Sequence, residues 1–184
     1  ESTFRVALLT SVEFLPFLLF TLPAGVWVDR LRRRPILMLG NLGRAVALGT
    51  VPVAHWLGVL TIWQLYVVGF LAGVCTVFFD VAYQSYLPSL VGRDQIVEGN
   101  AKLETSRSAA SVAGPGFAGL LVSALTAPVA ILADAVSFLV SALLLGVIRT
   151  EEAAPARAER RPLRTELLEG LRYVLGHSFQ RGIV

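Results

Sequence analysis

Four ionisable side chains lie inside long apolar runs of this sequence, and they are the residues best suited to carry chemistry. They are Glu13, Arg44, Asp80 and Asp134. A charged side chain in the hydrocarbon of a bilayer costs about 3 kcal/mol or more, so such groups usually face a partner or a water-filled cavity. A carboxyl group in such a cavity can take up a proton near neutral pH. We therefore predict that these residues bind protons or pair with one another.

The carboxyl groups of Glu13 and Asp134 are the candidate proton carriers, with Glu13 the first choice. From helix rise alone, Glu13 lies about 12 Å and Asp134 about 9 Å below the outer ends of their apolar runs. A group at that depth that exchanges a proton with one side at a time could couple proton movement to transport. The alternative is that each carboxyl group reaches the outer interface or hydrogen-bonds to a neighbouring helix.

Arg44 and Asp80 form a candidate intramembrane ion pair, because both lie in the cytoplasmic half of their runs. From helix rise, Arg44 is about 14 Å and Asp80 about 10 Å from the cytoplasmic end. Two roles remain open for the pair. It could hold two helices in register as a fixed contact, or it could be a gate that breaks and re-forms.

Composition places the chain in the membrane. Hydrophobic residues make up 55% of the 184 residues and charged residues 16%, and the mean hydropathy is +0.68. The net charge of +3 does not indicate nucleic-acid binding, because the positive residues fall between apolar runs instead of forming a surface stripe. The sequence has one cysteine, Cys75, and no metal-ligand spacing, nucleophile-base pair or phosphate-binding loop. We predict no metal, no cofactor and no enzymatic activity.

The apolar runs define five predicted transmembrane helices within residues 1–148. About 20 apolar residues suffice to cross a bilayer. The predicted spans are Val6–Val28, Pro35–Leu57, Ile62–Leu87, Ser108–Leu125 and Pro128–Ile148. The connections after the first, third and fifth spans carry arginine or lysine, whereas the other two carry neither. By the positive-inside rule the charged connections are cytoplasmic and the neutral ones lie outside.

The sequence changes character after the fifth span. Residues 149–162 are rich in Glu, Ala, Pro and Arg and are predicted to be a flexible cytoplasmic linker. Residues 163–181 show a leucine stripe at helical spacing, which predicts an amphipathic helix lying on the inner membrane surface or packed on a partner domain. Residues 182–184 are expected to begin another transmembrane helix. Because the chain lacks an initiator methionine, we expect it to be part of a longer protein.

Small residues recur every four positions on two of the predicted helices. Gly69 and Gly73 form one such pair, and Ser111, Pro115 and Gly119 continue the same spacing on the fourth span. Such faces let two helix backbones approach closely. They could be static packing surfaces, or, where Pro115 bends the helix, surfaces that rock against a neighbour.

Several motifs together resemble the major facilitator superfamily of transporters. The stretch Gly25-x-x-x-Asp29-Arg30-x-x-Arg33-Arg34 resembles the signature of the loop between its second and third helices. Gly114-Pro115-x-x-x-Gly119 resembles the fifth-helix signature associated with antiporters. The stretches 78–88, 98–101 and 134–138 are similar to the bacterial drug- and siderophore-exporting branch, and residues 169–173 resemble the helix that joins the two halves.

The resemblance implies an all-α membrane protein with the major facilitator fold. The chain would supply helices two to six of twelve and the amphipathic helix between the two halves. It implies that Asp29, Arg30 and Arg33, with Gly25 and Arg34 in the same motif, hold the cytoplasmic ends of the two halves together in the outward-facing state. Arg32 replaces a glycine of the motif, and Leu65 stands where many drug–proton antiporters have an arginine.

The function that the resemblance implies is proton-coupled efflux of small amphiphilic molecules by alternating access. Its partners would be a small-molecule substrate, protons, the lipid bilayer and the C-terminal half of the same transporter, with no nucleic acid. Its location would be the bacterial inner (cytoplasmic) membrane, which it crosses several times. Two alternatives remain: an uptake or facilitative permease of the same fold, and a membrane sensor or assembly subunit that transports nothing.

Overall fold

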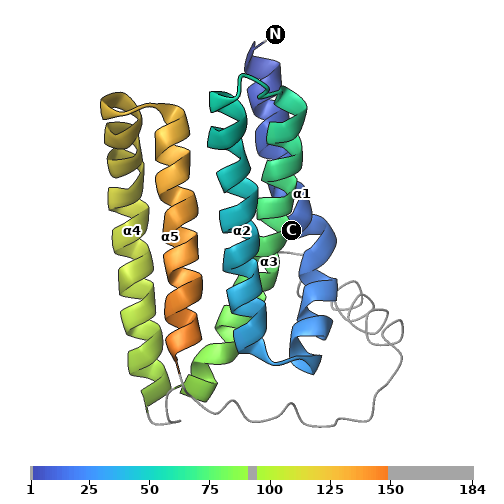
Figure 1. Cartoon of the computed structure of the whole chain (residues 1–184). Helices are drawn as coiled ribbons and strands as arrows, with labels where there is room; N and C mark the ends of the chain where they lie inside the picture. Colours follow the sequence, from blue (N-terminus) through green and yellow to red (C-terminus); the bar gives the residue numbers. More distant parts are fainter. Residues whose placement is uncertain (1, 91–94, 149–184) are drawn as a thin grey trace, which may run out of the picture.

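The computed structural model describes residues 2–90 and 95–148, which form five long helices (Figure 1). The helices are α1 (Ser2–Arg30), α2 (Arg33–Trp56), α3 (Ile62–Leu90), α4 (Ile96–Ala124) and α5 (Ala127–Val147). The all-helical fold class is therefore confirmed. The predicted linker at 149–162, the amphipathic helix at 163–181 and the helix start at 182–184 lie outside the described residues.

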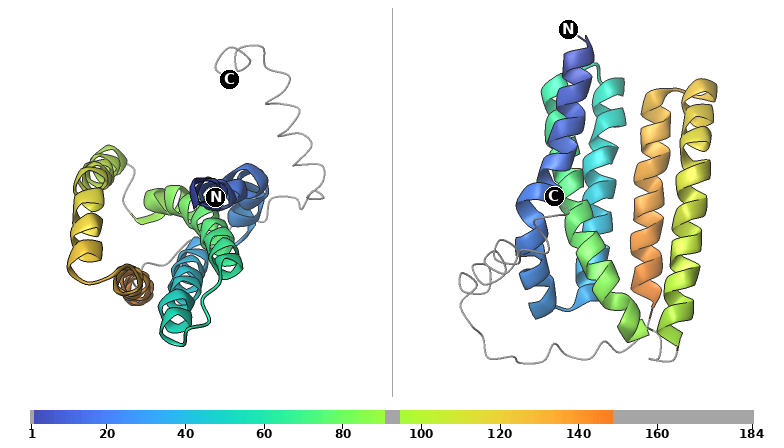
Figure 2. Two further views of the ribbon diagram at one scale, coloured as in Figure 1. Left: turned by 90° about the horizontal axis from the view of Figure 1, so that it is seen from above. Right: turned by 180° about the vertical axis from the view of Figure 1, so that it is seen from behind.

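The five helices run alternately up and down, so that consecutive helices are antiparallel (Figure 1). The short connections between α2 and α3 and between α4 and α5 lie at the same end of the bundle as the N-terminus. The α1–α2 connection and the end of α5 lie at the opposite end (Figures 1 and 2). This arrangement agrees with the positive-inside assignment, which puts the neutral connections outside and the arginine-rich ones in the cytoplasm.

Four of the helices are long and apolar enough to cross a membrane. These spans are Thr3–Arg30, Arg33–Trp56, Ile62–Tyr86 and Ala127–Val147. Helix α4 does not meet the same test, since its second half is built largely from Gly, Ala and Ser and includes Pro115. It nevertheless lies alongside α5 over its length (Figure 2). The predicted fourth span, Ser108–Leu125, therefore stays a prediction.

Helix α4 begins at Ile96, well before the predicted span at Ser108. Its first turns are polar, and they include an ion pair of 2.7 Å between Lys102 and Glu98, one helical turn apart on an exposed face. Such pairs stabilise helices in water. The helix thus extends beyond the apolar segment, because helix propensity and hydropathy are separate properties of the chain.

Packing is concentrated around α2 and α3. Helix α2 packs along both α3 and α5, and α1 packs along α3, whereas α4 makes few contacts and buries none of its own residues. A first core cluster, at the end of the bundle that holds the α1–α2 connection, joins α1, α2 and α3 through Val28, Leu37, Ala82 and Tyr86. A second cluster, nearer the end of the bundle with the α2–α3 connection, joins α2 and α3 through Ala47, Val51 and Val68, with Ile131 of α5 packed against it.

Helix α1 contains two prolines, Pro16 and Pro23, and its ribbon changes direction along its length (Figure 1). Proline removes one backbone hydrogen bond and bends a helix where it stands. Pro16 is buried against α3 at Gly73. The bend therefore falls where α1 and α3 are in contact.

Candidate transport site

The predicted gate motif spans the junction of α1 and α2. Asp29 and Arg30 are the last residues of α1 before the connection, and Arg33 and Arg34 open α2. A hydrogen bond of 3.3 Å from the Leu31 amide to the Val28 carbonyl closes the turn between the helices. Asp29 is exposed at this end of the bundle. The motif thus places an exposed carboxylate beside several arginines.

Arg34 makes a contact between α2 and α5 that the motif alone did not predict. Its Nε donates a hydrogen bond of 3.0 Å to the Leu145 carbonyl, and its Nη2 donates to the Gly146 carbonyl. Both carbonyls belong to the last turn of α5, where helix carbonyls lack partners within the helix. A cation also interacts favourably with the negative end of a helix dipole. Arg34 therefore joins the start of α2 to the end of α5.

Arg44 is the most deeply buried charged residue of the described chain, with 8% of its surface exposed. Its Nη2 donates a hydrogen bond to Asn41 Oδ1, and its Nη1 lies 3.5 Å from Thr76 Oγ1. The guanidinium also lies between two aromatic rings, 4.5 Å from the ring centre of Phe79 and 4.3 Å from that of Phe138. Cation–π contacts of this kind stabilise a desolvated guanidinium. Arg44 thus connects α2 to both α3 and α5.

The structure does not place Arg44 and Asp80 in a direct ion pair. Among the described residues, the groups bound to Arg44 are an amide, a hydroxyl and two rings, all of them neutral. The carboxylates of Asp80 and Asp134 are nevertheless both within electrostatic reach of Arg44. The predicted two-residue pair is therefore, in this conformation, a cation between two carboxylates that it does not touch.

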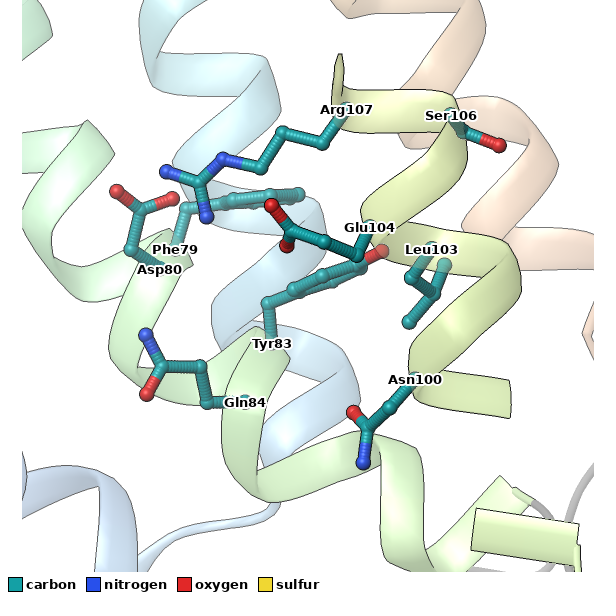
Figure 3. A pocket seen from close by; sticks show the side chains of 9 residues that line it. All are labelled: Phe79, Asp80, Tyr83, Gln84, Asn100, Leu103, Glu104, Ser106 and Arg107. Atoms are coloured by element: carbon teal, nitrogen blue, oxygen red, sulfur yellow. The ribbon is translucent and has the colours of Figure 1, made fainter. Parts of the chain in front are cut away.

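Asp80 faces a cavity between α3 and α4, which is shown in Figure 3. The cavity has a volume of about 760 Å³ and is lined by Phe79, Asp80, Tyr83, Gln84, Asn100, Leu103, Glu104, Ser106 and Arg107. The rings of Phe79 and Tyr83 are stacked, with centres 5.8 Å apart. The Arg107 side chain extends from α4 towards Asp80 and Phe79 (Figure 3) and interacts electrostatically with Asp80. The cavity therefore combines aromatic faces with charges of both signs.

The two candidate proton carriers lie far apart in the bundle. Glu13 is exposed on α1, which packs on α3, and Asp134 is exposed on α5, which packs on α2. The structure therefore does not bring Glu13 and Asp134 together into one site. Of the two, Asp134 is the one that interacts electrostatically with Arg44.

The two small-residue faces have different environments. Gly73 touches α1 closely: a Cβ at this position would lie 2.6 Å from the Glu13 carbonyl oxygen and 2.9 Å from Pro16 Cγ. Gly69 is less crowded, since its nearest neighbour would be Leu9 Cδ1 at 3.7 Å. On α4, no described atom lies within 4 Å of a Cβ built at Gly114 or Gly119. The antiporter-like face, with Pro115, is therefore uncovered in this part of the protein.

The sequence reasoning missed three parts of this site, all of them partners of Arg44. Asn41, one turn before Arg44 on α2, is 1% exposed and carries the contact with the guanidinium. Phe79 and Phe138 supply the rings. The spacing of Asn41 and Arg44 in an otherwise apolar run was a usable signal, because a buried charge needs polar neighbours. The rings gave no such signal, since aromatic residues are common throughout membrane helices.

No metal site is present in the described part of the chain. In residues 2–90 and 95–148, no group of three or more His, Cys, Asp or Glu side chains is placed to hold a metal ion.

The chain belongs to the Major Facilitator Superfamily, whose family profile matches residues 2–182. Over 171 residues it is 32% identical to the multidrug efflux pump Tap of Mycolicibacterium fortuitum, covering 87% of this chain and 41% of that protein. It is 24% identical over 148 residues to macrolide efflux protein A of Streptococcus pyogenes, covering 80% and 36%. No solved structure matches the chain significantly.

A third relative is also an efflux pump that the chain matches over most of its own length. The multidrug efflux pump Tap of Mycobacterium tuberculosis is 27% identical over 180 residues, covering 92% of this chain. The chain spans about two fifths of the length of these relatives. The family and these efflux proteins agree with the exporter branch that the motifs resemble. The apolar helices and the family make it a multi-pass membrane protein.

Proposed function

We propose that the complete protein exports small amphiphilic molecules across the bacterial inner membrane by alternating access, driven by protons returning inward. The observation that carries the proposal is the cavity between α3 and α4. It lies towards the cytoplasmic end of the bundle, and it offers stacked aromatic rings beside Asp80, Glu104 and Arg107. An amphiphilic compound taken from the cytoplasm would find both apolar and charged contacts there. Efflux relatives support the direction of transport.

Alternating access needs a second bundle, which the C-terminal half of the transporter would supply. In such transporters two bundles rock around a site near the middle of the membrane. The exposed Asp29 and its neighbouring arginines stand at the end of the bundle where that half would dock in the outward-facing state. The uncovered face of α4, with Gly114, Pro115 and Gly119, is available to pack against further helices of the complete protein.

Proton coupling is assigned to Glu13 and Asp134. Both are carboxyl groups within apolar helices, and both side chains are exposed, so protons could reach them from a water-filled cavity of the complete transporter. Uptake of a proton by either group would remove a negative charge from its helix. This loss of charge would couple protons to export if it altered the relative stability of the outward-facing and inward-facing conformations.

The test uses everted vesicles that contain the complete transporter and have an acidic interior reported by a pH-sensitive dye. Addition of amphiphilic drugs should release protons, and the release should be absent from Glu13→Gln vesicles that carry the same amount of protein. Downhill exchange of substrate can persist in that variant, because it needs no proton. Facilitated movement without proton release would instead favour a permease, and a complete absence of substrate flux would favour a subunit without transport activity.

A further inference from the structure

We propose that Arg44 is a movable internal cation that takes Asp80 as its counter-ion in one conformation of the transport cycle and Asp134 in the other. The proposal rests on the proposed transport function and deepens it. It assigns to Arg44, Asp80 and Asp134 one shared role, in place of a fixed Arg44–Asp80 pair.

The first observation is that Arg44 is incompletely satisfied where it stands. A guanidinium has five N–H donors and binds a carboxylate best through two parallel hydrogen bonds. Here it is buried, bound only to neutral groups, and one of its two hydrogen bonds has a length of 3.5 Å. Within the described residues, its Nε has no hydrogen-bond partner. Two aromatic faces hold the cation without fixing its orientation.

The second observation is the placement of the two carboxylates along the membrane normal. Asp80 comes four residues after Thr76 on α3, which runs towards the cytoplasm, so it lies about 6 Å further in. Asp134 comes four residues before Phe138 on α5, which runs in the same direction, so it lies about 6 Å further out. Arg44 touches Thr76 and Phe138. It therefore stands between an inner and an outer acid.

The third observation is that the helices around Arg44 are closely packed, so the side chain is the part free to move. A Cβ at Gly43 would lie 2.7 Å from Cys75 Sγ, and one at Gly40 would lie 3.2 Å from the Cys75 carbonyl oxygen. Helices α2 and α3 are thus nearly in backbone contact one turn from Arg44. Rotation about the flexible bonds of the arginine side chain is therefore the movement that the proposal requires, and the helices can stay packed while it occurs.

Few other charged groups surround Arg44, Asp80 and Asp134, which together we call the switch. The titratable groups within electrostatic reach of Arg44, among the residues described, are Cys75 and Asp80 on α3 and Asp134 on α5. Asp80 also interacts with Arg107 of α4 across the cavity. Arg107 can therefore neutralise Asp80 while Arg44 is with Asp134. Protonation of Asp134 would have the opposite effect and send Arg44 towards Asp80.

The test follows the conformation of the complete transporter directly, without substrate or a proton gradient. In a cysteine-free background that includes Cys75→Ser, a single reporter is placed by Gln84→Cys in the cytoplasmic half or by Ser123→Cys near the outer end of α4. A membrane-impermeant maleimide is applied to everted vesicles for the first reporter and to intact cells for the second, both treated with an uncoupler so that no proton gradient is present. Labelling rates are then compared after Asp80→Asn and Asp134→Asn.

Asp80→Asn should leave Arg44 with Asp134, and Asp134→Asn should leave it with Asp80. At each reporter, we expect one variant to raise the labelling rate and the other to lower it, by about threefold or more. A variant that raises the rate at one reporter should lower it at the other. In an Arg44→Gln background, both variants should leave the rates unchanged, because the shared cation is gone.

Three results would overturn the switch: shifts in the same direction from both acids, shifts confined to the reporter nearer the substituted acid, or shifts that persist without Arg44. If Arg44→Gln fails to fold, the proposal is judged only by whether the two acid variants change the labelling rates of the two reporters in opposite directions. Arg107→Gln serves as a control for local charge at Gln84→Cys, and should not reproduce the effect of Asp80→Asn at the Ser123→Cys reporter. Because no transport is measured, the test can contradict the exchange of Arg44 between the two carboxylates without contradicting the proposed export. The proposed export can likewise be contradicted by the vesicle experiment without affecting this result.

Discussion

Asn41 on α2 donates its side-chain amide to the hydroxyl of Ser141 on α5, with the nitrogen and oxygen 2.8 Å apart. The carbonyl oxygen of the same amide accepts a hydrogen bond from Arg44. Both ends of the Asn41 side chain are therefore used, which settles its orientation. Through this residue the buried cation is connected to α5, so the polar contacts of three helices form one network inside the bundle.

Asn41→Ala is expected to destabilise the complete transporter by about 2 kcal/mol, because it leaves the buried guanidinium with only its long 3.5 Å hydrogen bond to Thr76. Ser141→Ala removes only a neutral contact and is expected to cost about 0.6 kcal/mol, as is usual for hydrogen bonds between membrane helices. The measurement is unfolding of the purified protein by denaturing detergent. Equal losses in the two variants would show that the contact with Arg44 contributes nothing beyond an ordinary hydrogen bond.

Gly73→Ala is expected to destabilise the α1–α3 contact by about 1–3 kcal/mol, the usual range for overpacking. The added methyl group would meet the backbone carbonyl of Glu13 at 2.6 Å, and backbone cannot move aside as a flexible side chain can. The matched control is Gly69→Ala on the same face, where the nearest atom is a leucine methyl at 3.7 Å. The yield of folded protein and its unfolding in detergent measure both. An unaffected Gly73→Ala protein would argue that α1 and α3 do not pack this closely.

Arg34→Gln is expected to lower stability by about 1.5–3 kcal/mol, the range for hydrogen bonds from charged groups. The variant loses the charge that joins α2 to the carbonyls of Leu145 and Gly146 at the end of α5. Unfolding in detergent gives the stability, and cross-linking between cysteines placed on α2 and α5 reports whether the ends separate. If transport falls while stability and cross-linking stay unchanged, Arg34 acts in the gate instead.

Asp29→Asn is expected to reduce transport by the complete protein strongly while leaving its insertion and stability unchanged. The carboxylate is exposed in this half, so its removal leaves no buried group unsatisfied, whereas the proposed contact with the other half depends on its charge. Efflux rates at matched expression give the answer. Arg32→Gln is the control, since Arg32 is exposed and makes no side-chain cap to α2. Normal efflux by the Asp29→Asn protein would remove this residue from the gate.

The gate and stability predictions separate two roles of charged residues that the motif presents together. Arg34 has partners within this half, so its substitution should affect folding of the half itself. Asp29 stands exposed at the end of α1, so its substitution should affect only the contact between halves. Comparing stability with transport for both variants therefore tests the two roles independently.

Much of the fold could be predicted from the sequence, because a bilayer imposes strict rules on it. A run such as Pro35–Leu57 must be helical to satisfy its backbone in hydrocarbon, and its length follows from the bilayer thickness. The observed helix, Arg33–Trp56, differs from it by one or two residues at each end. Arginines between the runs predicted the alternating direction of the helices. The first turns of α4 were not predicted to be helical, because hydropathy identifies apolar segments and these turns are polar.

What the sequence by itself determined was the class: a chain of apolar helices with charges at one end of the bundle and a family motif at the α1–α2 junction. Only the tertiary structure decided the partners. Arg44 contacts two rings and an amide rather than Asp80, and Gly73 is crowded where Gly69 is not. The physical reason is that hydropathy and charge determine how each segment interacts with lipid or water, so they can be read segment by segment along the sequence. Contacts depend on which helices pack together and on their rotation, and these are set jointly by side chains far apart in the sequence.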